Sequence, residues 1–278
     1  MAIVDSSPRH VFLLASGGFD STALICYYYL RGYIIHPYKM RYDSKQIEAE
    51  EVALKKVMEF FSMQVLPVTT IDIPLVNTSA LASDAEDVPT GAYSEVDSKS
   101  LMVPGRNLAF LSILANIAEA YALNNPDAKV FMSIGVHESD WDCYPDCRPE
   151  FIKTLQHLLH LGTEMRVTLD APFLFNSKGG VLSTITRNGE FVLPAHMKYA
   201  LHSSYSCYRG GEVHCGTCPT CIERHEAFMM AFGDDPTRYL RTPKLPNRPM
   251  LTSVRNDTDT ASLLNAVRND TGSISFRK

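Results

Sequence analysis

Short apolar runs alternate with longer segments whose apolar residues recur at helical spacing along most of the chain. The first run, at residues 10–15, precedes a pair of glycines and predicts a buried strand. Further strands are expected at residues 33–40, 64–73, 129–136 and 167–173. Helices are expected at residues 22–31, 45–61, 107–123 and 149–162, with a shorter helical stretch from Lys178. Elements in this order build a parallel sheet covered on both faces, so the predicted fold class is α/β with a doubly wound parallel sheet.

The composition is that of an ordinary globular protein. Hydrophobic residues make up 45% and charged residues 21%, which excludes wholesale disorder. The apolar runs fall short of the roughly 20 residues that a bilayer span needs, and the N-terminal segment lacks the pattern of a secretory signal. The net charge of −5 provides no overall basic field for nucleic acid. We therefore expect a cytoplasmic protein with no membrane association and without nucleic acid as its main partner.

The segment between the first strand and the first helix reads Ser-Gly-Gly-Phe-Asp-Ser-Thr. Its glycines let backbone N–H groups approach a ligand closely, and its hydroxyls and the helix N-terminus favour an anion. The alternative is a tight turn with Ser and Asp capping. The string SGGxDS resembles the pyrophosphate loop of ATP-pyrophosphatases and lacks the lysine of a Walker loop. The resemblance predicts an ATP site formed by Ser16, Gly17, Gly18, Asp20, Ser21 and Thr22. Asp20 either caps the helix or faces a phosphate-bound magnesium ion.

Four of the seven cysteines lie close together, as Cys207-x7-Cys215-x2-Cys218-x2-Cys221. Four thiolates close a tetrahedron around a structural Zn²⁺, and two Cys-x-x-Cys steps let one short knuckle supply three of them. Two disulfides or a redox pair are alternatives that the glycine-rich spacing disfavours. His214 is either a competing ligand or a neighbour of the cluster.

A third candidate segment follows the predicted strand at 129–136 and contains Tyr144, Asp146 and Arg148. Open α/β sheets bind ligands beyond the carboxyl ends of their strands. A carboxylate there can accept from a guanine-like edge, and an arginine can clamp a substrate carboxylate. On chemistry alone, a proline-rich turn with an Asp cap explains the segment more simply.

We expect three parts in the chain. Residues 1–204 form the α/β nucleotide-binding domain, and residues 205–246 form a zinc knuckle with a closing helix. Residues 247–278 repeat the pentapeptide VRNDT and form a weakly ordered tail. Residues 78–100 hold five acids and one lysine, which predicts a mobile loop over the edge of the sheet.

Together these segments resemble the QueC family, the 7-cyano-7-deazaguanine synthases of the queuosine pathway. The matching strings are SGGFDST, VPGRNLAFLS, GVHESDWDCYPDCRPEF, SCYRGGEVHCGTCPTCIER and DDPTRYL. The resemblance implies a sheet of the adenine-nucleotide alpha-hydrolase type and an ATP-dependent C–N ligase. The resemblance implies that the enzyme activates the carboxylate of 7-carboxy-7-deazaguanine as an adenylate for attack by ammonia, and yields the amide and then the nitrile. ATP, Mg²⁺ and Zn²⁺ are the implied cofactors, and family members often pair as homodimers.

The resemblance also implies roles for individual residues. The proposed catalytic residues are Asp20, Lys178 and Arg148. The nucleotide is expected to contact Arg106 and Asn107 in addition to the glycine loop. The substrate is expected to contact Tyr38, Arg41, Tyr144, Asp146, Arg148 and Arg224.

One segment departs from the family pattern and keeps a second hypothesis open. Where family members carry Tyr-Gly-Gln-Arg-His, residues 38–42 read Tyr-Lys-Met-Arg-Tyr, which loses an amide and an imidazole. A chain altered there could couple the activated carboxylate to an amine of a protein and stop at the amide. A zinc-knuckle module that binds RNA, and a relative of tRNA-thiolation enzymes or NAD synthetase that shares only the loop, are less favoured. The acidity of the chain and the third segment argue against them.

Overall fold

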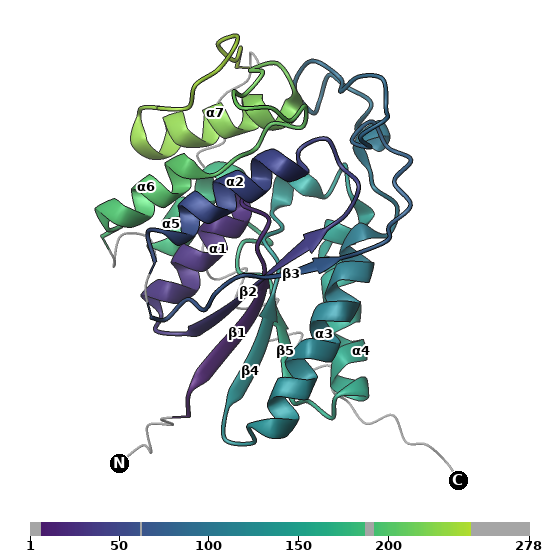
Figure 1. Cartoon of the computed structure of the whole chain (residues 1–278), viewed down its shortest axis with the longest axis vertical. Helices are drawn as coiled ribbons and strands as arrows, with labels where there is room; N and C mark the ends of the chain where they lie inside the picture. The colour runs from purple at the N-terminus through teal and green to yellow at the C-terminus, as the bar shows by residue number, and fades with distance from the viewer. Residues whose placement is uncertain (1–6, 62, 187–191, 246–278) are drawn as a thin grey trace.

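Strands and helices alternate as expected over the part of the chain that the computed structural model describes, residues 7–61, 63–186 and 192–245 (Figure 1). The predicted tail at 247–278 and its repeats lie outside the described residues. The strands are β1 (Arg9–Leu14), β2 (Ile34–Arg41), β3 (Thr69–Asp72), β4 (Lys129–Ser133) and β5 (Val167–Asp170). The α-helices are α1 (Phe19–Leu30), α2 (Ile47–Met58), α3 (Arg106–Asn124), α4 (Pro149–Gly162), α5 (Val181–Ile185), α6 (Ala195–Ser203) and α7 (Pro219–Phe232). Short 3₁₀ turns occupy η1 (Ser98–Leu101), η2 (Glu138–Asp140), η3 (Pro145–Cys147) and η4 (Lys178–Gly180).

The five strands form one parallel sheet in the order β3-β2-β1-β4-β5, which confirms the predicted fold class. The central strand β1 pairs with both neighbours, since Val11 lies opposite Ile35 on β2 and Phe131 on β4. The chain runs outward from β1 to β3 and then crosses to β4 on the other side. The order therefore reverses between β1 and β4, where doubly wound sheets bind ligands at their carboxyl ends.

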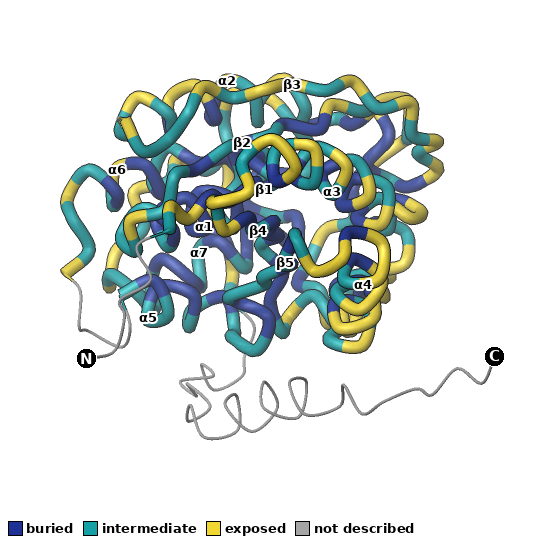
Figure 2. The backbone as a smooth tube through the Cα atoms, turned by 90° about the horizontal axis from the view of Figure 1, so that it is seen from below, coloured by how far each residue is buried: buried dark blue, intermediate teal, exposed yellow. Residues whose placement is uncertain are grey.

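Helices cover both faces of the sheet, and side chains of β1 alternate between them. Val11 and Leu13 pack into a core with α1, α2, α5, α6 and α7, whereas Phe12 packs into a second core with α3 and α4. Figure 2 shows these two groups of helices on opposite sides of the buried central strands. This layering explains the near-continuous apolar sequence of β1, because a strand that is buried on both faces has no polar side.

The third strand is shorter than the predicted range 64–73. Val65 makes an isolated parallel bridge to Ile35 on β2, and the regular ladder starts only at Thr69. Pro67 lies between them and has no N–H group to donate, so it interrupts the ladder.

Residues 98–124, which contain α3, are long and apolar enough to cross a membrane by composition alone. This differs from the expectation that every apolar run is too short. The helix instead packs within the protein: Leu111, Leu114 and Ala118 are fully buried in the second core against β4. Length and hydropathy therefore reflect a core helix here.

The acidic segment 78–100 is irregular, as expected, but its apolar side chains are fixed. Leu81 and Val88 are buried in a third core together with the cysteines. Arg209 fastens the segment by an ion pair with Asp87 and a hydrogen bond of 2.6 Å to the Val88 carbonyl. The loop is thus anchored to the cysteine lobe (residues 205–245). The sequence had instead predicted a mobile loop over the edge of the sheet.

Candidate active site

A cleft of about 220 Å³ lies beyond the carboxyl ends of β1, β2 and β4. On one side lies the turn between β1 and α1, in which Gly17 has a φ of +94°. A Cβ on Gly17 would lie 2.3 Å from the Glu50 carbonyl oxygen, so α2 leaves room only for glycine there. This contact holds the turn against α2.

The polar groups of this turn converge within hydrogen-bond distance. The N–H of Gly18 donates to Ser16 Oγ at 3.0 Å and the N–H of Gly17 to Ser21 Oγ at 3.2 Å. Thr22 Oγ1 lies behind the turn and donates to the Gly18 carbonyl at 2.8 Å. The N-cap of α1 is Gly18, and no side chain of the described residues caps this N-terminus. Uncapped N–H groups, hydroxyls and a helix dipole suit the polyphosphate of a nucleotide.

Charged side chains form a network at the floor of the cleft. Lys178 Nζ lies 3.1 Å from Asp20 Oδ2 and 3.0 Å from Glu223 Oε2. Burial alone would lower the pKa of Lys178, but Asp20, Glu223 and Asp140 outweigh it and hold that pKa above its ordinary value. The amine therefore stays protonated. Asp20 Oδ1 is buried without a hydrogen-bond partner among the described residues and lies 3.6 Å from His137 Nε2. An orphaned carboxylate oxygen beside an anion cradle fits a magnesium ion.

The altered segment on β2 contributes a second buried cation. Lys39 has a side chain only 2% exposed, and its Nζ lies 2.5 Å from Glu50 Oε2 and 2.8 Å from the Ser16 carbonyl oxygen. It thereby ties the glycine turn to α2. Tyr38 lines the cleft, as predicted. Arg41 does not, because it is half-exposed and pairs with Glu51 and Asp72 at the outer edge of the sheet.

A cluster of tyrosines, Tyr42, Tyr93, Tyr144 and Tyr208, lines the opposite side of the cleft. The hydroxyl of Tyr208 lies 2.8 Å from that of Tyr93 and 3.2 Å from that of Tyr144. Burial raises the pKa of Tyr144 to about 12 and holds the pKa values of Tyr93 and Tyr208 well above their ordinary value. The hydroxyls therefore remain neutral donors. Arg106, at the first position of α3, lies beside them, with Nη1 3.5 Å from the hydroxyl of Tyr42.

Some residues of the third candidate segment line the cleft, and others lie outside it. Tyr144 lines the cleft, whereas Asp146 Oδ2 accepts from the backbone N–H of Asn107 at 3.1 Å and caps α3. Arg148 is exposed at the N-cap of α4, and its Nε donates to the Trp141 carbonyl at 2.9 Å. Of residues 144–149, then, the structure brings Tyr144 and Cys147 into the cleft.

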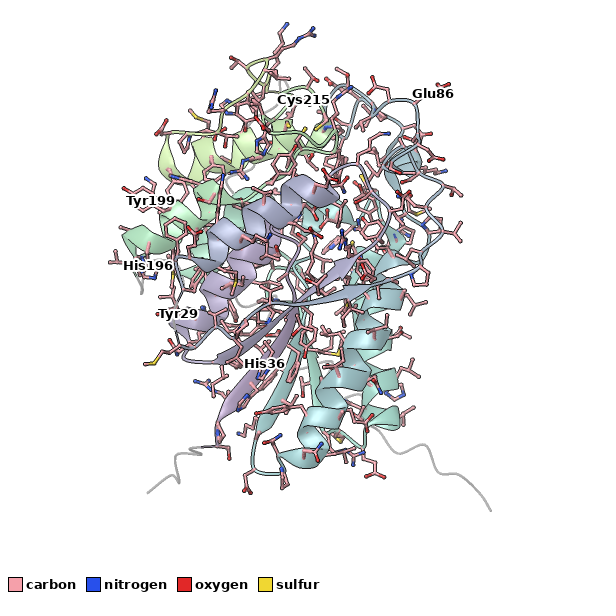
Figure 3. All side chains as sticks on the ribbon, viewed as in Figure 1. Tyr29, His36, Glu86, His196, Tyr199 and Cys215 are labelled. Atoms are coloured by element: carbon pink, nitrogen blue, oxygen red, sulfur yellow. The ribbon has the colours of Figure 1, made fainter. Side chains whose placement is uncertain are left out.

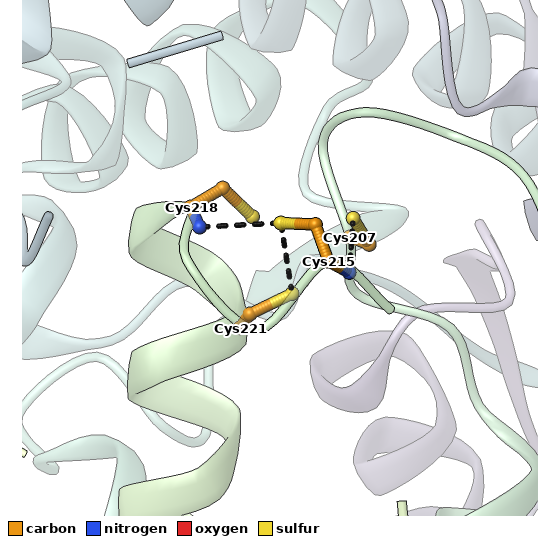
Figure 4. Close-up of side chains that lie close together, drawn as sticks. All are labelled: Cys207, Cys215, Cys218 and Cys221. Carbon is orange, nitrogen blue, oxygen red and sulfur yellow. Dashed lines mark hydrogen bonds between the residues drawn. The ribbon is translucent and has the colours of Figure 1, made fainter. Parts of the chain in front are cut away.

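The four cysteines of the lobe gather as a metal site requires. Their sulfur atoms lie within 4.8 Å of one another, and all four residues are buried (Figure 4). The N–H groups of Cys218 and Cys215 donate to the sulfurs of Cys215 and Cys207 at 3.3 and 3.4 Å. His214 stands apart from this set, since its Nε2 accepts from the N–H of Ser206 at 3.1 Å. The thiol set fits zinc.

Arg224, which follows the last cysteine on α7, is fully buried and does not line the cleft. It donates to acceptors from α6, from the segment that follows α6, and from residue 237. Its neighbour Glu223 faces the cleft instead and reaches Lys178.

Most of the predicted site residues meet in one place. Those that line the cleft are Ser16, Gly18, Asp20, Ser21, Tyr38, Arg106, Asn107, Tyr144 and Lys178. Those that lie behind or outside it are Gly17, Thr22, Arg41, Asp146, Arg148 and Arg224. Sequence reasoning assigned no role to several residues that line it, namely Lys39, Tyr42, Glu50, Tyr93, Asp140, Tyr208 and Glu223. The lysine on β2 was the one readable signal among them, because a charged side chain is unexpected in a strand that is covered on both faces.

Comparisons with known proteins converge on one family. The family model described as queuosine biosynthesis protein QueC matches residues 10–232. A 7-cyano-7-deazaguanine synthase of Caldicellulosiruptor bescii is 35% identical over 82% of this chain and 96% of its own length. A protein of the same name from Pseudoalteromonas atlantica is 32% identical over 83% of this chain and 99% of its own length. Another from Rhizobium rhizogenes is 34% identical over 82% of this chain and 90% of its own length. A solved structure, NMN synthetase from Francisella tularensis, has a TM-score of 0.24 and 13% identity over 69% of this chain and 82% of that one, which is too low to carry an argument.

Proposed function

The chain belongs to the QueC family of queuosine biosynthesis proteins, and from this premise we propose that it is an ATP-dependent ligase acting on 7-carboxy-7-deazaguanine. Ammonia is the second substrate, and the product passes through 7-amido-7-deazaguanine to 7-cyano-7-deazaguanine. One observation carries the proposal: the uncapped N-terminus of α1 and the Lys178 ion-pair network face the same cleft at the reversal point of the sheet.

The chemistry requires activation because a carboxylate is a poor acyl donor. In the first half, a carboxylate oxygen attacks the α-phosphorus of ATP, pyrophosphate leaves, and an acyl-adenylate forms. Ammonia then attacks the carbonyl carbon, and AMP departs with the carboxylate oxygen to leave the amide. In the second half, the amide oxygen is adenylated in the same way. Loss of AMP and two protons then yields the nitrile.

The residues of the cleft suit these steps. The turn at Ser16, Gly18 and Ser21 would hold the phosphates, and Lys178 keeps a positive charge where negative charge develops on the leaving pyrophosphate. Asp20 Oδ1 would hold a magnesium ion, which when bound neutralises phosphate charge. Lys39 fixes the turn through the Ser16 carbonyl.

The cysteine lobe supports the cleft from the side. Zinc held by the four thiols would fix the start of α7, which carries Glu223, and the segment with Tyr205 and Tyr208. All three residues line the cleft. The role of the metal in this proposal is structural, because four protein thiols leave no open position for a substrate.

The test is a reaction of zinc-loaded protein with ATP, ammonium and the acid carrying ¹⁸O in its carboxylate, followed by mass spectrometry. We expect the nitrile, pyrophosphate, and AMP that contains ¹⁸O. If ¹⁸O appeared in inorganic phosphate and ADP formed, the intermediate would be an acyl-phosphate and not an adenylate. No nucleotide consumption would refute the proposed function.

The same measurement addresses coupling to a protein amine, which no contact among the described residues favours. An amide on a protein, with no nitrile, would establish that alternative. A homodimer and a cytoplasmic location remain expectations.

A further inference from the structure

Arg106 is a charged group in the cleft without a charged partner. Its guanidinium has five N–H donors, yet its hydrogen bonds are two long ones, 3.4 Å from Nε to Asn107 Oδ1 and 3.5 Å from Nη1 to the hydroxyl of Tyr42. It makes no ion pair with any acid in the described part of the chain. Asp146, close in the fold, is engaged by the N–H of Asn107. A guanidinium placed this way retains most of its donors for an anion.

The surroundings of Arg106 indicate which anion. The hydroxyls of Tyr93, Tyr144 and Tyr208 form a connected group within 3.2 Å, and Tyr42 packs edge-on to Phe110 at a ring separation of 5.5 Å. All these residues line the cleft. Aromatic faces with neutral hydroxyl donors suit a flat heterocycle with polar edges rather than a phosphate chain. The phosphate features, the glycine turn and the Lys178 network, lie on other elements.

We propose that Arg106 binds the carboxylate of the planar acid substrate while the tyrosine cluster (Tyr42, Tyr93, Tyr144 and Tyr208) holds its ring. This inference rests on the proposed function and goes further by assigning the acid subsite to particular residues. The fork of an arginine matches a carboxylate bidentately and fixes its plane. The subsite therefore orients the carboxylate towards the nucleotide turn across the same cleft, as in-line attack on a phosphate requires.

Arg106 thereby takes the carboxylate-binding role that was predicted for Arg148. Arg148 is exposed, donates to the Trp141 carbonyl and lies outside the cleft. Arg106 itself was predicted to contact the nucleotide, and the subsite assigns it to the acid instead. The lobe completes this subsite, because Tyr208 follows directly on the metal ligand Cys207.

The experiment compares two ligands on the full-length, zinc-loaded chain by calorimetry. The probes are 7-carboxy-7-deazaguanine and its neutral amide, with ATP titrated separately. Hydrogen bonds to charged groups contribute about 1.5–3 kcal/mol, or roughly 10- to 150-fold in affinity. Arg106→Met should weaken the acid by such a factor, while the affinities for the amide and for ATP change less than about threefold. Arg106→Lys, which keeps the charge without the fork, should lose part of the preference for the acid over the amide.

The controls separate the possible failures. Arg166→Met, at an ion-paired arginine outside the cleft, should alter none of the three affinities. Equal binding of acid by the wild type and by folded Arg106→Met or Arg106→Lys would overturn the subsite. So would loss of acid binding in Arg148→Met alone, or loss of ATP instead of acid in Arg106→Met. Failure of the wild type to bind any acid would strike the proposed function itself. Should Arg106→Met fail to fold, Arg106→Lys still decides.

Discussion

The cysteine lobe and the cleft each enclose an arginine, and the two guanidinium groups have opposite surroundings. Arg224 in the lobe makes five hydrogen bonds at 2.9–3.4 Å to hydroxyl and carbonyl oxygens. Arg106 in the cleft makes two, both at the long limit. Burial lowers the pKa of Arg224, whereas the tyrosine hydroxyls outweigh burial at Arg106 and raise its pKa.

This difference separates a group that stabilises the fold from one that is free to bind. The donors of Arg224 join the end of α6, Ser206 and Thr237, so the residue links α6 to two segments of the lobe. Such a saturated guanidinium has no donor left to reach a substrate, which gives no support to the predicted substrate contact of Arg224. The N–H donors of Arg106 that lack a partner carry a cost in free energy, and a ligand that accepts hydrogen bonds from them removes this cost. Hydrogen-bond saturation, more than burial, distinguishes the two roles.

The largest effect should come from removing the zinc that we propose holds the lobe. Structural zinc contributes about 10–16 kcal/mol in zinc-finger peptides, against a net stability of about 5–15 kcal/mol for a whole protein. We expect Cys218→Ala to lose bound zinc, measured by elemental analysis, and to open the lobe to protease. Because Tyr208 then leaves the cleft, binding of the acid should fall as well.

A matched variant makes this result specific to the cluster. Cys143→Ala removes a buried thiol that lies outside the four-cysteine set. It should keep the zinc and the protease resistance of the wild type. Zinc retention in Cys218→Ala would contradict a four-thiol site.

The next effect tests the saturated arginine directly. Arg224→Met leaves the buried hydroxyl of Ser204 and the partly buried hydroxyls of Ser206 and Thr237 without their donor. We expect a loss of about 3 kcal/mol or more in the free energy of unfolding, measured by urea denaturation. The affinity for the acid relative to its amide should stay unchanged in the folded protein. A selective loss of acid binding in Arg224→Met would break the contrast with Arg106.

The contrast also marks the limit of what the sequence predicted. The alternation of elements, the glycine turn and the cysteine spacing are local patterns in the sequence. Each of them predicts a structure without knowledge of the tertiary fold. Whether the side chains of residues 144–148 reach the cleft depends on the direction in which each of them points after a short turn. Asp146 turns to cap α3 and Arg148 turns outward at the N-cap of α4. Arg106 was predicted beside the nucleotide and does line the cleft, whereas Glu223 comes from a distant segment, so its place in the cleft required the tertiary fold.

Lys178 is the intermediate case, because it is fully ion-paired and yet lines the cleft. Lys178→Gln removes the charge between Asp20 and Glu223 and should reduce kcat by about 10²- to 10³-fold, as does the loss of one donor to a developing charge. Pyrophosphate release measures the rate, and Lys55→Gln, an exposed substitution on α2, is the control. Unchanged turnover in Lys178→Gln would place this lysine with Arg224, among groups that act only on the fold.

The smallest effect concerns a half-buried histidine, His36, which lies in neither region. His36 lies near the other end of the sheet from the lobe residue Cys215 (Figure 3). Its ring stacks on Phe12 at 4.2 Å, and its Nε2 lies 3.0 Å from Nδ1 of His10, which also contacts the hydroxyl of Tyr121. Burial, and then the neighbouring His10, lower the pKa of His36 to about 4. The folded state therefore favours the neutral ring.

The sign of the pH dependence follows from this lowered pKa. An unfolded histidine has a pKa of about 6.5, so between there and about 4 the unfolded chain binds more protons than the folded one. The stability that His36 contributes is complete above pH 6.5 and declines as the pH falls towards 4. His36→Phe keeps the stacking on Phe12. It should make the fall in Tm between pH 7 and pH 5 smaller by about 2–4 °C, which is the shift in Tm that about 1 kcal/mol produces in a chain of this size. His157→Phe, at an exposed position on α4, should leave the slope as in the wild type. If His36→Phe kept the wild-type slope too, the His10–His36 pair would not be a source of acid sensitivity.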